Sequence, residues 1–138
     1  MPDESQADFD ARHVVQLERA AGLGNAEAQY ALSMLLDAGE LLPRDHKRAG
    51  MLLRAAAENR YPHAMWQLGL VLVYGTRGEL VNASAGLSLI REAAALRSEG
   101  ALRTLADFYR AGLFGLERNV DEAQRLIVIA ESSEALPL

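Results

Sequence analysis

The stretch AAGLGNAEAQYALSMLLDAGELLPRDHKRA, residues 20–49, contains a pattern that returns twice further along the chain. Gly39, Gly75 and Gly112 are spaced by 36 and 37 residues. Three more columns keep this spacing and hold identical residues: Ala21, Ala57 and Ala94; Ala28, Ala64 and Ala101; Leu32, Leu68 and Leu105. Four agreeing columns indicate an internal repeat, and repeats of roughly 20–50 residues are typical of solenoids.

Each repeat is predicted to form two helices, A and B. In the A helix, apolar residues recur four, seven and eight positions after the alanine at 28, 64 or 101, and a glycine follows at eleven. At about 100° per residue, these positions share one face of a helix. The glycine is expected to end the helix, because the C-terminal cap takes a left-handed backbone.

The B helices are predicted to begin near Asp45, near Asn82 and at Asn119, and Asn119-Val-Asp-Glu122 has the spacing of a capping box. A leading B-type helix is expected before the first repeat, with Phe9, Leu17, Ala20 and Ala21 at its core positions. The sequence thus predicts seven helices, at about 7–22, 25–38, 45–59, 62–74, 82–97, 99–111 and 119–133.

The repeat resembles the Sel1-like repeat, a longer relative of the tetratricopeptide repeat. The resemblance covers about residues 20–130. Arg60 and Arg97 depart from it, since they replace the loop glycine of the family pattern. The first repeat carries that pattern at Ala20, Ala21, Gly24, Asn25, Ala28, Leu32, Gly39, Leu42, Asp45, Arg48 and Ala49.

This resemblance implies an all-α fold, a right-handed α-α superhelix (solenoid) of about three helix-pair repeats plus a leading helix. It also implies that the A helices line a concave surface and that the chain serves protein–protein interaction. We expect a disordered acidic N-terminus at 1–6, a single helical-repeat domain at 7–134 and a C-terminal tail at 135–138. The repeats are expected at about 20–54, 55–92 and 93–130.

Composition narrows the class of protein further. The net charge of −5 argues against a nucleic-acid binder, because neutralising phosphates needs a clustered basic surface. The absence of cysteine excludes disulfides and thiolate chemistry. No apolar run approaches the ~20 residues that span a bilayer, and no signal peptide is evident, so we expect a cytoplasmic protein with no membrane partner. We also expect the protein to be of bacterial type.

The sequence predicts no catalytic residue, no metal site and no cofactor. His13, His46 and His63 lack the spacing of metal ligands. His13 occupies a position where the other repeats carry a core alanine, so we expect it to be partly buried, whereas His46 and His63 are expected at the surface. No phosphate-binding glycine loop or nucleophile elbow is present, and the chain is predicted not to be an enzyme.

The candidate partner-binding residues lie on the A helices, on the side opposite the core. They occupy positions two, six and nine after each repeat alanine, about 180–240° away from it. We expect them to form one strip along the concave surface, apolar in the middle and charged at one end; the alternative is that neighbouring helices bury the apolar part. The nine residues are Tyr30, Met34, Asp37, Trp66, Leu70, Val73, Arg103, Asp107 and Arg110.

The last helix offers a second candidate surface. Ala123, Ile127 and Ala130 are expected to face inward, while Val128 and Ile129 point to the other side. A solenoid needs a polar end, so the tail at 135–138 or a second copy of the chain, in a homodimer, would cover these two residues.

The functional hypothesis is an adaptor that binds a protein or peptide partner on the concave face. One alternative is an immunity- or inhibitor-type protein that neutralises a partner enzyme. Another, the least favoured because convergent polar groups are lacking, is a small-ligand-binding protein or hydrolase.

Overall fold

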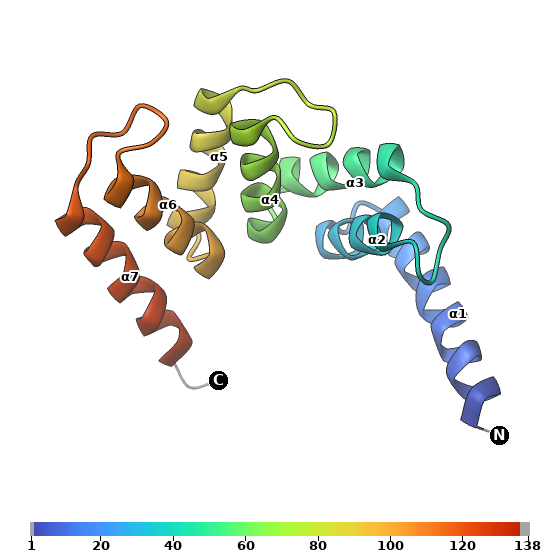
Figure 1. Ribbon diagram of the computed structural model, residues 1–138. Helices are drawn as coiled ribbons and strands as arrows, with labels where there is room; N and C mark the ends of the chain where they lie inside the picture. The colour runs from blue at the N-terminus through green and yellow to red at the C-terminus, as the bar shows by residue number, and fades with distance from the viewer. Residues whose placement is uncertain (1, 136–138) are drawn as a thin grey trace. The chain divides into compact units, whose positions relative to one another are not determined.

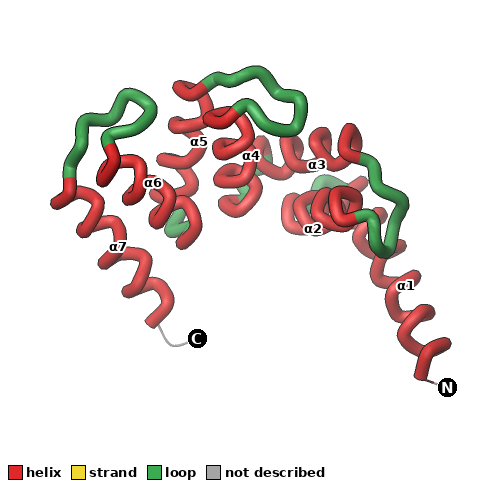
Figure 2. The backbone as a smooth tube through the Cα atoms, in the orientation of Figure 1, coloured by secondary structure: helices red, strands yellow, loops and turns green. Residues whose placement is uncertain are grey.

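The computed structural model describes residues 2–135, and in that range it has seven helices and no strand (Figure 1 and Figure 2). This confirms the all-α prediction and the order of the helices. No helix of the described range combines the length and the apolar character that crossing a bilayer requires. The helices are α1 (Pro2–Gly22), α2 (Ala26–Ala38), α3 (His46–Glu58), α4 (Pro62–Tyr74), α5 (Ala83–Ala95), α6 (Glu99–Ala111) and α7 (Val120–Ala135).

Helix α1 begins at Pro2, earlier than the predicted start at 7, so residues 2–6 are helical in the structure. The chain divides into two compact units between Tyr61 and Pro62. The N-terminal unit contains α1 to α3 and the C-terminal unit contains α4 to α7, and each is described by itself. A single domain over 7–134 stays a prediction.

Polar side chains cap the start of most helices, as the repeat pattern predicts. An N-cap oxygen accepts a hydrogen bond from the backbone N–H three residues on, which satisfies a donor that the helix cannot pair. These bonds are Asn25 Oδ1 to Ala28 N at 2.8 Å, Asp45 Oδ1 to Arg48 N at 3.0 Å, Asn82 Oδ1 to Ala85 N at 3.1 Å, Ser98 Oγ to Ala101 N at 3.3 Å and Asn119 Oδ1 to Glu122 N at 3.0 Å.

The capping box predicted at Asn119 forms only in part. Asn119 accepts from Glu122 N, but the Glu122 carboxylate does not return to the backbone of Asn119. It accepts two hydrogen bonds from Arg125 at 2.9 and 2.6 Å instead. The Asn119 N–H donates to the carbonyl of Tyr109 at 2.8 Å, so it needs no side-chain acceptor.

The same backbone bond closes every A–B helix pair. The N–H of the B-helix N-cap donates to an A-helix carbonyl three residues before the terminal glycine. Because it recurs at the same repeat position, this bond confirms the predicted period in backbone geometry. The three pairs are Asp45 N to Leu36 O at 3.1 Å, Asn82 N to Leu72 O at 2.8 Å and Asn119 N to Tyr109 O at 2.8 Å.

Arg60 and Arg97 occupy the loop position where the first repeat has Gly24. Their φ angles are 62° and 67°, in the left-handed region that costs an L-residue about 1 kcal/mol or more. The sequence therefore identified both departures correctly, and the backbone keeps the glycine conformation despite them.

We expect Arg60→Gly to raise the free energy of unfolding by about 1 kcal/mol, because glycine adopts a positive φ without strain. Urea denaturation followed by circular dichroism measures the effect as a higher midpoint at unchanged slope. Arg60→Ala is the control, since it removes the side chain but keeps the strain. A gain of equal size in both variants would assign the effect to the arginine side chain rather than to φ.

The core of the N-terminal unit consists of repeat positions. Leu32 and Ala49 are fully buried and form a cluster with Ala21, Ala28 and Leu36. The partly buried side chains that pack against this cluster are Leu17, Ala20, Leu42 and Leu52. Phe9 was predicted to join this core, and that prediction is wrong: it is 58% exposed. The packing of α1 instead begins at Leu17 and continues towards its C-terminal end.

In the C-terminal unit, α4 and α5 pack most extensively, and two glycines let their backbones touch. A Cβ built on Gly86 would lie 2.6 Å from the carbonyl oxygen of Gly69 and 2.9 Å from the backbone nitrogen of Val73. A Cβ on Gly69 would lie 2.6 Å from Ile90 Cγ1. The close approach buries Ile90 and Val73, which are 0% and 3% exposed.

Candidate partner-binding surface

On α2 of the N-terminal unit, the three predicted binding residues have different surroundings. Met34 is 43% exposed and lies at the surface as expected. Tyr30 is partly buried, with its ring centroid 5.3 Å from that of Tyr61, so one side of the ring is covered within the unit. An exposed methionine beside a half-covered tyrosine provides flexible and rigid apolar contact area.

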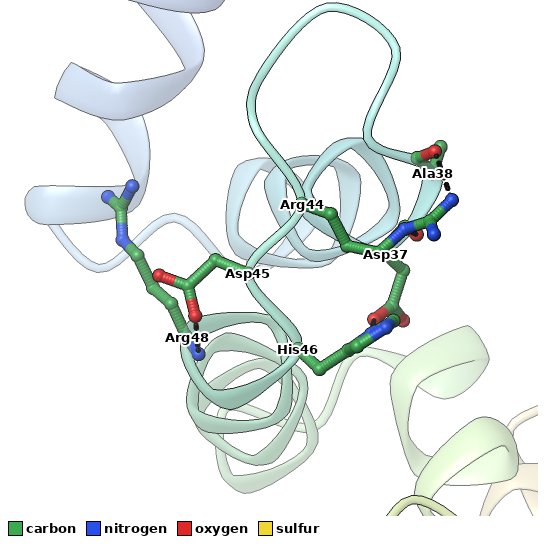
Figure 3. Close-up of polar contacts among 6 residues, drawn as sticks. All are labelled: Asp37, Ala38, Arg44, Asp45, His46 and Arg48. Atoms are coloured by element: carbon green, nitrogen blue, oxygen red, sulfur yellow. Dashed lines mark hydrogen bonds and ion pairs between the residues drawn. The ribbon is translucent and has the colours of Figure 1, made fainter.

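Asp37 takes part in a polar cluster at the end of α2 (Figure 3). One of its carboxylate oxygens lies 2.9 Å from His46 Nδ1. Arg44 donates to the backbone carbonyls of Asp37 and Ala38 at 3.2 and 3.1 Å, which places a cation on the negative end of the helix dipole. Asp37 therefore holds the loop after α2 through His46, and its other carboxylate oxygen is buried.

On α4 of the C-terminal unit, Trp66 connects two helices. Its indole Nε1–H donates to Thr104 Oγ1 of α6 at 3.0 Å. A Cβ built on Gly100 would lie 2.6 Å from two carbons of the indole ring, so glycine makes room for it. Trp66 is partly buried by these contacts, which means that the packing alternative holds for part of the ring.

The other two predicted binding positions on α4 differ in burial. Leu70 is partly buried, and Val73 is 3% exposed beneath α5, next to Gly86. Val73 thus belongs to the core of the C-terminal unit, and the surface predicted from sequence loses this residue. Sequence periodicity alone placed Val73 on the open side because it did not include the close approach of α5.

On α6, the charged residues are paired within the helix. Arg103 Nε donates to Glu99 at 2.9 Å, and Arg110 donates to Asp107 at 2.8 Å. Asp107 thus pairs with Arg110, while Arg103 pairs with Glu99, which lies one turn earlier. Pairs this exposed are weak, so both guanidinium groups can exchange partners at small cost.

Gly100 and Thr104 are functional neighbours that the sequence reasoning missed. Both lie on α6 and position Trp66, one by leaving space and the other by accepting its N–H. The available signal in the sequence was a glycine at 100, inside a predicted helix, where the repeat pattern does not require one.

A protein-family model for the Sel1 repeat matches residues 26–61, 62–98 and 101–127. The chain belongs to the Sel1 repeat family. The matched segments begin six to eight residues after the repeat starts predicted from sequence. Sel1 repeats generally serve as protein–protein interaction modules, and the fold is typically a binding scaffold without catalysis.

Solved structures show the same Sel1-repeat fold. A Sel1 repeat protein from Oxalobacter formigenes is 26% identical and superimposes with a TM-score of 0.77, over 88% of this chain and 90% of that one. A protective antigen present in uropathogenic Escherichia coli strains, which displays an SLR fold, is 24% identical with a TM-score of 0.76. The match covers 87% of this chain but only 25% of the antigen. Comparison with curated proteins finds no significant match.

The last Sel1 repeat ends on α7, whose apolar residues only partly follow the prediction. Ala123 and Ala130 are buried as expected, but Leu126 is the large buried residue between them and Ile127 is only partly buried. Val128 is 50% exposed and Ile129 is partly buried. The tail proposed to cover them reaches residues 136–138, which lie outside the described range, and the homodimer through Val128 and Ile129 stays a prediction.

The histidines of this Sel1 repeat chain are all at the surface. This is as predicted for His46 and His63, but wrong for His13, which is exposed and stacks on Phe9 with ring centroids 6.1 Å apart. Both residues lie in the part of α1 that precedes its packed segment. Within the described residues, no group of three or more histidines, aspartates or glutamates could hold a metal ion.

Proposed function

We propose that this chain is an adaptor that binds a protein or peptide partner through the outward side of its A helices. In the C-terminal unit the proposed surface comprises Trp66, Leu70, Arg103, Asp107 and Arg110. In the N-terminal unit it comprises Tyr30, Met34 and Asp37. Val73 is left out because its side chain is in the core.

The observation that carries the proposal is the neighbourhood of Trp66. Its ring is anchored by Thr104 and Gly100, so it is already ordered before any partner arrives. A pre-ordered aromatic residue loses little conformational entropy on binding, and tryptophan with arginine is the composition found at interface hot spots. Arg103 precedes Thr104 on α6, so the proposed surface includes a guanidinium group as well as the aromatic anchor.

Two exposed methionines of the N-terminal unit provide a test position and its control. Met34 is 43% exposed on the A helix α2, and Met51 is 65% exposed on the B helix α3. A partner that uses the A-helix side should lose contact when Met34 becomes charged and should tolerate the same change at Met51. The two positions differ in their helix, while the chemistry of the substitution is identical.

We expect Met34→Glu and Arg103→Glu each to weaken partner binding by about tenfold or more, with melting temperatures close to that of the parent chain. The partner is first captured from native lysate of the source cells and identified, and its affinity for each purified variant is then measured by calorimetry. Met51→Glu should bind like the parent. An equal loss in Met34→Glu and Met51→Glu, or no loss at Met34 and Arg103, would refute the proposed surface.

A further inference from the structure

A groove of about 330 Å³ opens in the C-terminal unit where α5, α6 and α7 come together. Its floor is apolar and made of buried side chains, Leu102 and Leu105 of α6 and Leu126 of α7. The rim carries three arginines and one carboxylate, namely Arg91, Arg97, Arg125 and Glu122. The rim is therefore positive in a chain whose net charge is −5.

This groove is separate from the A-helix surface proposed above. On α6 it is lined by Leu102, Leu105 and Tyr109, whereas Arg103 and Arg110 belong to the other surface. At about 100° per residue, the centres of these two sets lie roughly 120° apart around the helix. A change in one set therefore tests that surface without touching the other.

Two of the rim charges are paired with each other. Arg125 donates two hydrogen bonds to Glu122 on the same helix, at 2.9 and 2.6 Å, and the pKa of the Glu122 carboxyl is lowered by these bonds. Arg91 belongs to α5 and donates to the Tyr109 hydroxyl at 3.5 Å, which is a long bond. A guanidinium has five donors, so Arg91 retains the capacity to bind a carboxylate.

In the N-terminal unit, the residues at the same repeat positions form an ion pair between two helices. Arg91 and Glu18 are equivalent, because each lies three residues before a repeat alanine, Ala94 or Ala21. Glu122 and Arg48 are also equivalent, because each directly precedes an alanine near the start of its helix, Ala123 or Ala49. Arg48 donates to Glu18 at 3.0 Å and thereby links α3 to α1. The bond lowers the pKa of the Glu18 carboxyl.

In the C-terminal unit the charges at these two positions are reversed, and no ion pair between Arg91 and Glu122 is found in the described residues. Glu122 turns to Arg125 of its own helix, and Arg91 of α5 faces the groove with no carboxylate from α7 bound to it in the described part of the chain. Arg97, in the loop between α5 and α6, adds an exposed second cation. The C-terminal unit thus has a cationic groove rim at the positions where the N-terminal unit has an ion pair between α1 and α3.

We propose that this groove binds an acidic segment of a partner protein, whose carboxylates pair with Arg91 and Arg97 and whose aliphatic side chains lie on the leucine floor. Bidentate bonds between guanidinium and carboxylate groups are strong and directional, and the rim fits them. The leucine floor favours a peptide over a phosphate backbone, because a peptide supplies apolar side chains beside its carboxylates. A positive rim on a negative chain also guides an acidic segment to this site.

The test uses the full chain and a dye-labelled peptide, acetyl-Asp-Glu-Leu-Leu-Glu-Asp-Leu-amide, followed by fluorescence anisotropy. We expect saturable binding, weakened about tenfold or more in Arg91→Glu/Arg97→Glu. The matched control is Arg54→Glu/Arg60→Glu, which makes the same changes at the equivalent positions of the preceding repeat and should alter the dissociation constant less than about twofold. Arg91→Gln/Arg97→Gln, with a smaller loss, serves if the charge reversal lowers the melting temperature.

Two further probes separate the proposal from its alternatives. The peptide with Asn and Gln in place of its acids should bind about tenfold more weakly, and so should the peptide with serines in place of its leucines. Equal binding of a single-stranded oligonucleotide of matched charge would overturn the proposal, and so would an equal loss in the two double variants or a failure of the parent peptide to bind. Arg103→Glu should bind this peptide normally, so failure of this inference is distinguishable from failure of the A-helix surface.

Discussion

Gly86→Ala is expected to lower the free energy of unfolding of the C-terminal unit by about 2–3 kcal/mol and its melting temperature by about 10 °C or more. The added Cβ would lie 2.6 Å from the Gly69 carbonyl oxygen, 2.7 Å from Val73 Cγ2 and 2.9 Å from the Val73 nitrogen. Two of these atoms belong to the backbone of α4, so no side-chain rotation relieves the clash. The helices α4 and α5 must separate, and buried Ile90 and Val73 lose packing.

Gly50→Ala is the matched control for this prediction. Gly50 follows Ala49 in α3 as Gly86 follows Ala85 in α5, but a Cβ at position 50 meets nothing within 4 Å. There the change should be neutral or stabilising by up to about 1 kcal/mol, because alanine has the higher helix propensity. Thermal melts of both variants by circular dichroism decide the matter. Similar melting temperatures for the two would show that α4 and α5 do not pack through Gly69 and Gly86.

The sequence predicted the helices well because the repeat supplies each signal three times. A single glycine or asparagine is weak evidence, but Gly39, Gly75 and Gly112 agree on where the A helices end, and the backbone bonds from Asp45, Asn82 and Asn119 follow the same register. Positions that all repeats share are those that every helix pair must bury or cap. Such positions are set locally, and periodicity can identify them.

The candidate surface was harder to predict because it depends on residues that differ between repeats. Val73 and Leu70 occupy outward positions of α4, yet only Val73 is fully covered, since Gly86 lets α5 approach at that point. His13 and Phe9 fit core columns, but they lie on α1 ahead of its packed segment. In each case the outcome depends on the distance between two helices, and that distance is set by tertiary packing rather than by the pattern of one helix.

The partners of the charged side chains could not be predicted from the sequence either. Arg103 had Asp107 four residues after it and Glu99 four residues before it, and the structure pairs it with Glu99. The reversed positions of Arg91 and Glu122 relative to Glu18 and Arg48 are visible in the sequence once the repeats are aligned. That Glu122 would turn to Arg125 is not visible, because the choice between two nearby arginines is worth about 1 kcal/mol or less.

Trp66→Ala is expected to lower the free energy of unfolding by about 2–3 kcal/mol, somewhat less than the loss of a fully buried tryptophan, because the ring is only partly buried. The substitution removes the ring that fills the space above Gly100 and the hydrogen bond to Thr104. Urea denaturation of the full chain, monitored by circular dichroism at the helix bands, measures it.

Thr104→Val separates the two contributions. It removes the acceptor of the 3.0 Å hydrogen bond and leaves the ring in place, so it should cost only about 1 kcal/mol. If Trp66→Ala costs no more than Thr104→Val, the ring contributes nothing to the packing of α4 on α6 and is free to serve a partner alone. If the larger loss is found, any decrease in partner binding by Trp66→Ala contains a structural part. Binding must then be compared in Thr104→Val, where the exposed edge of the indole is intact and only its anchor has been weakened.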